Sequence, residues 1–458
     1  MFYFFFNKIK YHLLLFVIFL VGFISILELE QSIFLSFILF GIVGLAIAKT
    51  LCKYAENIFI IIYSYTVLFI VLFFFIFKLE HGVPYEGGGS DSKSYEIGAE
   101  LLTNSNFFKY DVEKIGEIIE MPYHNSPGYI YVVFLLAKMS NIYGEFHTMV
   151  PRLFNAFILA LSLPYLFYIG KELKLDIIAS LNSAIICGIF PITTLIASQT
   201  YRDIIVMAIF IFSVYFAMKF YTSAFVKKIH IYLIFFFLSV LILQFRFLNV
   251  LNVLSTIFTA SLLSLFSIKI ISVRKAFLFI SLLIISIIVF NENLFIENLI
   301  NTLDVYNQAT SQGLDRSTEN GLSLILFNLP PIVKQISVFF YATITPLPIF
   351  YTKFVEFNFL SIGTIIQFCY LPFLVIGFFN KLKNPIAAPM NILFIITLVG
   401  YVYGSFSFRH IVYLVPFAVV YISVGLNIRP NSNNLVIKVQ FLVITLLIFL
   451  YYFIKYIV

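Results

Sequence analysis

Charged residues are scarce in this chain. Asp, Glu, Lys and Arg make up only 11% of its 458 residues, whereas hydrophobic residues make up 61%. A water-soluble domain carries roughly 25% charged residues. A chain this long with so little charge cannot cover a surface that faces water on all sides. Its composition therefore excludes an ordinary soluble enzyme and predicts an integral membrane protein solvated by lipid.

Tryptophan is absent and cysteine is rare. No Trp accompanies the 58 Phe and 29 Tyr, and Ile, Lys and Asn are abundant. This bias is typical of an AT-rich genome and hints at a bacterial source. Cys52, Cys187 and Cys369 lie in or beside apolar segments without paired spacing, so they predict neither a disulfide framework nor a zinc site.

The signatures of several soluble enzyme classes are also missing. The sequence contains no P-loop, Rossmann fingerprint, serine nucleophile elbow or HExxH motif. The net charge is +7, but most Lys and Arg residues lie in short loops between apolar runs. This distribution is typical of membrane orientation by the positive-inside rule, and it does not favour a nucleic acid as partner.

Long apolar runs recur along the chain. About thirteen of them approach the length needed to cross a hydrocarbon core of ~30 Å. They predict an all-α polytopic protein with one membrane domain spanning residues 1–458. The runs lie at about 12–28, 32–50, 56–78, 149–170, 176–197, 203–221, 230–246, 249–268, 276–291, 358–378, 387–405, 410–427 and 435–455.

Two long polar stretches divide these runs into three groups. The predicted spans fall within residues 1–78, 149–291 and 358–458, and the stretches between them are residues 79–148 and 292–357. If the N-terminus is inside, every inside connection carries Lys or Arg, whereas acids gather on the other side. The positive-inside rule then places both long stretches at the outer face.

Two further apolar runs test this topology. Residues 127–143 and 331–350 are apolar enough to be considered as spans. Counting either one alone as a full span would invert every basic loop that follows it. We therefore interpret both as helices that lie on, or dip into, the outer face.

The first outer segment begins with a flexible turn followed by an acid. The glycines at 87–89 allow a sharp turn, and Asp91 or a flanking serine can cap a helix that starts near Lys93. Asp91 would then lie at the mouth of a cavity between helices. An acid there can take a proton from a sugar hydroxyl or hold a divalent metal against a phosphate, and helix capping alone is the alternative.

Short motifs in this segment and beyond resemble the GT-C superfamily of glycosyltransferases. The pattern of Asp91, Ser92, Tyr95 and Ala99 is similar to the first outer loop of the protein mannosyltransferase and aminoarabinose transferase branch. The likeness covers roughly residues 80–425. It continues with Asn125-Ser126-Pro127-Gly128-Tyr129, the Tyr143-Gly144 turn, Arg152 with Asn155, the stretch from Ser198 to Asp203, and Ser407-Phe408-Arg409-His410 with Pro416.

The resemblance implies a function and a location. It implies an inverting transfer of a sugar from a polyprenyl-phosphate-linked donor to a glycan or lipid acceptor. The enzyme would lie in the bacterial cytoplasmic (inner) membrane among membrane lipids, with its active site facing the periplasm or exterior.

The resemblance also implies roles for individual residues. Asp91 would be the catalytic base or would orient the acceptor hydroxyl, and Asp203 and Tyr95 would bind the acceptor or a metal. Guanidinium groups suit phosphate because they can donate two parallel hydrogen bonds. The lipid phosphate would be held by Arg202, Arg246 and Arg409.

The chain departs from the family pattern in two ways. Three predicted spans precede the first outer loop, where the family usually has one, so two helices are added with the parity unchanged. Ser92 and Lys93 follow Asp91, so a paired D-x-D or D-E is missing. A divalent metal cofactor, Mg²⁺ or Mn²⁺, is therefore an open expectation.

Four arginines at the outer ends of predicted spans are consistent with this interpretation without depending on it. A charge near the membrane is costly to leave unpaired and often marks a functional cavity. The alternative is that each arginine extends to the lipid headgroups or pairs with an acid. The four residues are Arg152, Arg202, Arg246 and Arg409.

Two other functions stay open. An O-antigen or capsule repeat-unit polymerase would place its main catalytic loop in residues 292–357 around Arg316, with His410 as a further candidate. A flippase or transporter of lipid-linked oligosaccharide would have broken helices and ionisable residues near mid-membrane. The span centres are nearly bare of charge, which favours an enzyme over a transporter.

Overall fold

A computed structural model describes most of the chain. The described residues are 2–51, 53–88, 91–105, 115, 117, 127–222, 225–246, 249–267, 330, 333, 354–404, 408–428 and 433–457. All regular structure within them is helical, which confirms the all-α prediction. The predicted run at 276–291 lies outside the described residues, as does nearly all of the segment 292–357.

Six helices in the described part of the chain are long and apolar enough to cross a membrane. They identify a helical membrane protein, although the predicted count of about thirteen spans is not confirmed. A bent pair of shorter helices, α8 (Ile177–Ile189) and α9 (Pro191–Ala197), raises the number to seven if it counts as one span. The six are α1 (Phe2–Leu27), α2 (Gln31–Leu51), α3 (Lys53–His81), α7 (Met149–Glu172), α10 (Asp203–Thr222) and α17 (Val355–Leu382).

Shorter apolar helices accompany these spans. All except α6 coincide with predicted apolar runs, and α6 coincides with the run at 127–143 that we interpreted as an outer-face helix. With 14 residues, α6 is about 21 Å long and too short to cross the membrane. These helices are α6 (Pro127–Ser140), α11 (Phe225–Phe245), α12 (Val250–Ser267), α18 (Ala388–Gly404), α19 (Val415–Ile428) and α20 (Asn433–Ile457).

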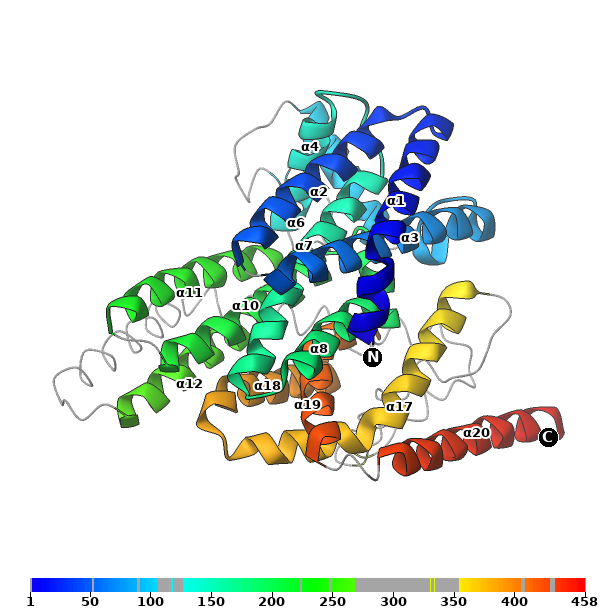
Figure 1. The fold of residues 1–458 in the computed structure, drawn as a ribbon. Helices are drawn as coiled ribbons and strands as arrows, with labels where there is room; N and C mark the ends of the chain where they lie inside the picture. Colours follow the sequence, from blue (N-terminus) through cyan, green and yellow to red (C-terminus); the bar gives the residue numbers. More distant parts are fainter. Residues whose placement is uncertain are drawn as a thin grey trace.

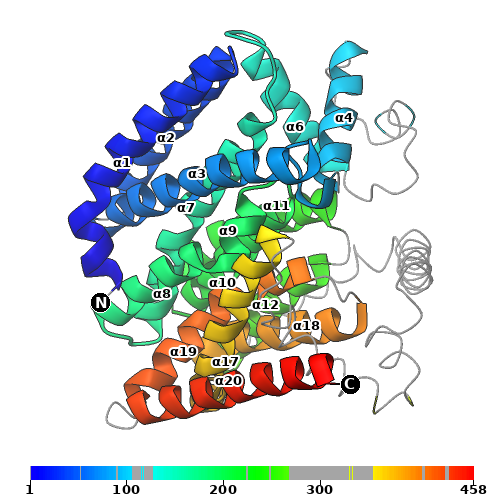
Figure 2. The same ribbon diagram turned by 90° about the vertical axis from the view of Figure 1, so that its right-hand side faces the viewer.

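The remaining elements are short or lie between spans. They are η1 (Glu86–Gly88), α4 (Asp91–Asn104), η3 (Pro385–Ala387) and η4 (Phe408–Tyr413). Helix α4 packs against α6. In Figure 2, α4 and the C-terminus lie at the right of the bundle and the N-terminus lies at the left. Helix α4, the first helix of the predicted outer segment, therefore lies away from the N-terminus in this view.

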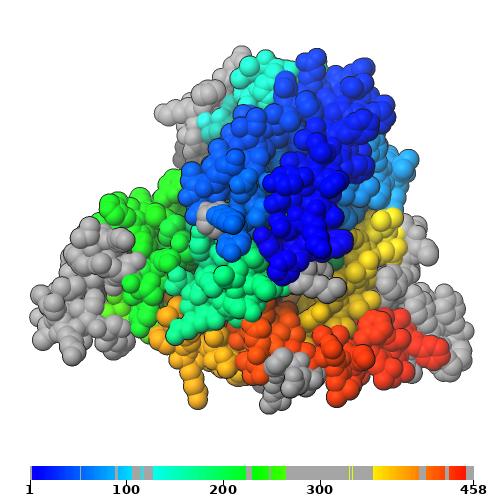
Figure 3. All heavy atoms as spheres, in the orientation of Figure 1, coloured from blue at the N-terminus to red at the C-terminus, as the bar shows by residue number. Residues whose placement is uncertain are grey.

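Helices α3, α7 and α10 form the centre of the bundle (Figure 1). In the most apolar 18-residue stretch of each of these helices, 72%, 67% and 67% of the residues are buried, compared with 28% in the corresponding stretch of α1. Helix α7 packs against α2, α3, α8 and α10. Figure 3 shows α1 and α2, in blue, at the front of the upper part of the face in view. Large apolar side chains such as Phe19 are exposed on α1, as expected where a helix faces lipid.

Two glycines allow α17 and α19 to approach closely. A Cβ atom on Gly377 would lie 1.9 Å from the carbonyl oxygen of Tyr421, and one on Gly425 would lie 2.1 Å from that of Phe373. Small residues at helix contacts are common in membranes because close backbone approach increases packing. This contact fixes the second half of α19 against α17, and η4 with Arg409 precedes the start of α19.

The bend between α8 and α9 also positions the site. The two helix axes differ by 53°, with Phe190 in an extended conformation and Pro191 at the first position of α9. After α9 the chain runs through a buried connection that includes Thr200. This path brings Arg202 to the start of α10.

Candidate functional site

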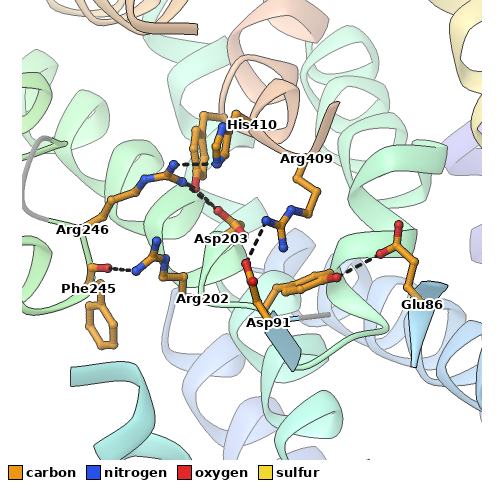
Figure 4. Close-up of polar contacts among 10 residues, drawn as sticks. Glu86, Asp91, Arg202, Asp203, Phe245, Arg246, Arg409 and His410 are labelled. Carbon is orange, nitrogen blue, oxygen red and sulfur yellow. Dashed lines mark hydrogen bonds and ion pairs between the residues drawn. The ribbon is translucent and has the colours of Figure 1, made fainter. Parts of the chain in front are cut away.

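Two carboxylates and two arginines from distant parts of the chain meet in one region, shown in Figure 4. Arg409 donates a hydrogen bond from Nη2 to Oδ2 of Asp91 at 2.8 Å, across 318 residues of sequence. Arg246 donates from Nη1 to Oδ1 of Asp203 at 3.1 Å. The structure thus brings together four of the residues to which the resemblance gives roles. We call this region the arginine site; Arg202, Tyr201, Glu86, His410 and Tyr413 complete it.

Asp203 belongs to the buried part of the arginine site. It is the first residue of α10, its side chain is 6% exposed, and it accepts a hydrogen bond from the hydroxyl of Tyr413. That hydroxyl in turn accepts a hydrogen bond from Arg246 at 2.5 Å. Asp203 is therefore held by two donors in the interior of the bundle.

His410 holds the other side of the Arg246 guanidinium. Its Nε2 lies 2.6 Å from Nη2 of Arg246. Burial and the neighbouring arginines lower the pKa of His410 well below its usual value. The imidazole is therefore neutral, and its Nε2 accepts the hydrogen bond that Arg246 donates.

Asp91 belongs to the open part of the arginine site. Its side chain is 50% exposed, whereas that of Arg409 is 22% exposed. The Arg409 guanidinium also lies over the ring of Tyr201, 4.7 Å from the centroid, in a cation–π contact. Asp91 is thus a carboxylate held by an arginine but still accessible from outside the bundle.

Glu86 borders the same region. Its Oε2 accepts a hydrogen bond of 3.1 Å from the hydroxyl of Tyr201. Burial raises the pKa of Glu86 to about 7, although Arg409 and the Tyr201 hydroxyl partly oppose this rise. Glu86 therefore carries only part of a negative charge at neutral pH.

The arginine site carries more positive than negative charge. Arg202 joins it through a hydrogen bond of 3.2 Å from Nη1 to the carbonyl oxygen of Phe245. The three arginines of the site face the side chains of Asp91 and Asp203, a neutral imidazole and the partly protonated Glu86. An excess of guanidinium charge favours an anionic ligand such as a phosphate.

A second polar cluster lies deeper and is nearly closed to solvent. Glu96 accepts hydrogen bonds from the hydroxyls of Tyr85 at 2.7 Å, Thr148 at 2.8 Å and Thr200. Arg152 is fully buried, and its Nη2 donates to the Thr148 hydroxyl at 3.2 Å. We call these five residues the Glu96 cluster. They tie α4 to α7 and to the connection before α10.

Three predicted residues lie elsewhere or outside the described part of the chain. Tyr95 is 3% exposed and packs edge-on against Tyr129, with 4.9 Å between ring centroids. Its predicted role in acceptor binding stays a prediction. Arg152 belongs to the Glu96 cluster rather than to the arginine site, and Arg316 lies outside the described residues.

The start of α4 lies close to the predicted one. We expected a helix that begins near Lys93, and α4 begins at Asp91. The glycine turn expected before it includes Gly87, which η1 holds at φ 60°, a conformation that glycine adopts without strain. Asp91 therefore lies in the first helical turn, where its carboxylate meets Arg409.

Several residues of both clusters were not found from the sequence. Tyr201, Tyr413 and Thr200 act through hydroxyl groups, and a chain with 29 Tyr residues gives no reason to select two of them. Glu96 follows Asp91 by five positions on a helix in which Glu100 is exposed. Among these residues, Tyr413 could have been selected by its position, because it follows Arg409 by about one helical turn.

The carboxylates of the arginine site do not form a good divalent-cation site. The Asp203 carboxylate contacts Arg246 and the Tyr413 hydroxyl, and Asp91 contacts Arg409. A cation at either carboxylate would be repelled by these guanidinium groups. The carboxylates of the arginine site therefore do not fit the Mg²⁺ or Mn²⁺ ion that the resemblance left open.

Comparison of the chain with protein-family models and with curated protein sequences gives no match. The class defined by the fold and the site is a helical membrane protein with a partly exposed carboxylate beside clustered arginines. The GT-C resemblance rests on the short sequence motifs.

Proposed function

We propose that this protein is a membrane glycosyltransferase that moves a sugar from a polyprenyl-phosphate-linked donor to a glycan or lipid acceptor. The observation that supports this best is the half-exposed carboxylate of Asp91, which is paired with Arg409 in the region that also contains Arg202 and Arg246 (Figure 4). Such a transfer needs a group that takes the acceptor's proton and cations that stabilise the departing phosphate. The arginine site contains both kinds of group within one region.

The proposed reaction gives Asp91 and the arginines separate tasks. Asp91 accepts the proton of the acceptor hydroxyl, whose oxygen forms a bond to the anomeric carbon of the donor sugar. The bond between that carbon and the phosphate oxygen breaks on the opposite face, which inverts the configuration. The departing polyprenyl phosphate takes the bonding electron pair, and Arg202 and Arg409 stabilise its negative charge.

Asp203 acts as a positioning residue in this proposal. Its carboxylate is almost fully buried and already accepts hydrogen bonds from Arg246 and Tyr413. It therefore orients Arg246 toward the site without contacting the sugar. A buried acid with two donors is suited to holding a guanidinium in a fixed direction.

We further propose the bacterial cytoplasmic membrane as location, with the arginine site toward the periplasm or exterior. The distribution of Lys and Arg between the short loops supports this orientation. A lipid-linked donor would then enter the site from the surrounding bilayer.

The proposal is tested by comparing wild type with Asp91→Asn. Both proteins, purified in detergent, receive a pool of polyprenyl-phosphate-linked monosaccharides and a membrane lipid extract. We expect transfer to fall about 10²–10⁴-fold in the variant, since loss of a general base costs that much. Glu100→Gln is the matched control, because Glu100 is an exposed acid on the same helix.

Other outcomes of this experiment distinguish the alternatives. Unchanged transfer by Asp91→Asn would contradict the role of Asp91. Growth of chains from pyrophosphate-linked repeat units, without transfer from monosaccharide donors, would support the repeat-unit polymerase and a role for His410. The bent pair α8–α9 is the feature that a transporter would share, and movement of an unmodified lipid-linked glycan across vesicles would support that function.

A further inference from the structure

A group of metal-ligating side chains lies outside the arginine site, where the end of α3 meets the start of α17. Glu80 and His81 are the last two residues of α3, and Glu356 is the second residue of α17. One ligand atom from each lies within 4.8 Å of the other two. Two membrane helices far apart in sequence thus contribute one imidazole and two carboxylates to the same point.

The separations between these atoms do not match direct hydrogen bonds. Nε2 of His81 lies 3.9 Å from Oε2 of Glu80 and 3.8 Å from Oε1 of Glu356. A hydrogen bond from nitrogen to oxygen requires about 2.7–3.2 Å. Two ligands of a tetrahedral zinc ion that each lie about 2.0–2.2 Å from it are roughly 3.3–3.6 Å apart. The two His81 separations are slightly longer, and all three ligand atoms lie within 4.8 Å of one another, so small rotations of the side chains would bring them to a common ion.

The strongest indication of a bound metal ion is the environment of Glu356. This residue is 2% exposed, and its Oε2 has no hydrogen-bond partner. The Nε2 atom of His81 is also buried without a hydrogen-bond partner. Burying a carboxylate that is only partly paired is costly, so a cation at this point would lower the cost of burying Glu356.

The surrounding contacts orient the three side chains toward one another. The other oxygen of Glu80, Oε1, accepts a hydrogen bond of 3.2 Å from the backbone N–H of Val355. The His81 ring stacks on Phe77 and on Phe354, with centroid separations of 6.1 and 5.8 Å. Such outer contacts fix the direction of metal ligands in known sites.

We propose that Glu80, His81 and Glu356 bind a divalent transition-metal ion, with zinc as the first candidate. One imidazole nitrogen and two carboxylate oxygens are ligands that zinc accepts, and three protein ligands leave one tetrahedral position for water or another group. The imidazole disfavours Ca²⁺ and Mg²⁺, which prefer oxygen ligands alone.

The bound ion would join two parts of the protein that shape the arginine site. Glu80 and His81 directly precede the loop that carries Glu86 and leads to Asp91. The ion would fasten this loop's origin to the start of α17. Its role is therefore structural, and it is separate from the proton transfer proposed for Asp91.

Metal content tests the proposal directly. The protein, purified with a tag other than polyhistidine, is stripped with EDTA, reloaded with Zn²⁺, desalted and analysed by inductively coupled plasma mass spectrometry. We expect about one zinc per chain for wild type. Zinc affinity should fall by more than about 100-fold in His81→Ala and in Glu356→Gln.

Matched controls separate the site from adventitious binding. His230→Ala and Glu145→Gln change the same residue types at exposed positions and should keep the zinc. Zinc should also raise the thermal unfolding midpoint of wild type, but not that of the two site variants. If Glu356→Gln does not fold, Glu80→Gln replaces it, because the Glu80 side chain is 20% exposed.

Two results would overturn the proposal. One is a wild-type protein that retains no more zinc than His81→Ala. The other is binding of Mg²⁺ or Ca²⁺ with no preference for zinc. The measurement counts bound metal and not sugar transfer. A protein without bound zinc would therefore leave the proposed glycosyltransferase function untouched, and a protein without transfer activity would leave the proposed metal site untouched.

Discussion

The arginine site and the Glu96 cluster contain the same kinds of residue but differ in exposure. The Asp91 side chain is 50% exposed, whereas Glu96 is 4% exposed and Arg152 is fully buried. Three hydroxyl donors surround the Glu96 carboxylate. An acid whose lone pairs are filled by the protein holds the fold together, while an accessible acid beside excess positive charge can meet a substrate.

The two regions are connected through one helix. Asp91 and Glu96 both lie on α4, which packs on α6. The Glu96 cluster anchors the body of α4 against the bundle, so its first turn is held where Asp91 reaches Arg409. A site residue on an anchored helix is positioned more precisely than one on a loop.

The largest expected effect on stability comes from removing the buried arginine. Arg152→Met removes a fully buried guanidinium together with its hydrogen bonds to the Thr148 hydroxyl and to the carbonyl oxygen of Pro84, so we expect a loss of about 3–5 kcal/mol in the free energy of unfolding. The measurement is the thermal unfolding midpoint in detergent. Adding Glu96→Gln should restore part of the loss, because the double variant no longer buries an acid that has lost its neighbouring cation.

If the double variant recovers full transfer activity, the Glu96 cluster acts through the fold alone and differs in this from the arginine site. A stable Arg152→Met protein that has lost transfer would instead place Arg152 in the functional site.

Replacing Arg409 by Lys should have a smaller effect, confined to function. Lysine keeps the charge but loses the planar guanidinium that pairs with Asp91 and lies over Tyr201. We expect the KM for the lipid-linked donor to rise about 10–100-fold, equivalent to about 1.4–2.8 kcal/mol. The unfolding midpoint should change little, since Arg409 is partly exposed. A large fall in the midpoint at unchanged KM would contradict this assignment.

The smallest expected effect concerns Glu86 and depends on pH. Burial raises the pKa of Glu86 to about 7 from 4.5, so the folded protein binds this proton more tightly than the unfolded chain does. The stability contributed by this group is therefore highest below about pH 4.5 and falls as the pH rises toward 7. Glu86→Gln should consequently stabilise the protein by about 1–2 kcal/mol at pH 8.

The same variant provides its own control through the pH. At pH 5 the Glu86 carboxyl is protonated in the folded protein, so the unfolding midpoints of wild type and Glu86→Gln should nearly coincide. A difference that is the same at pH 5 and pH 8 would show that ionisation of Glu86 is not the cause. The measurement is a series of thermal unfolding curves between these pH values.

Sequence reasoning reached the fold class and part of the site. It predicted the helical membrane class from the apolar runs, and it selected Asp91, Asp203, Arg246 and Arg409 from short motifs. It did not predict that Asp203 would be buried beneath Arg246 and Tyr413 while Asp91 stayed accessible. Exposure depends on which neighbours cover a residue, and a single sequence does not give those neighbours.

Composition and the long apolar runs were enough to predict a helical membrane protein, because a backbone surrounded by lipid must satisfy its hydrogen bonds within each segment. Which charges pair could be read only from the way the helices pack. The contact between Asp91 and Arg409 spans 318 residues, and Glu80, His81 and Glu356 meet only because α3 and α17 end and begin at the same point. Such pairings follow from how helices pack against one another, and packing depends on the whole chain at once.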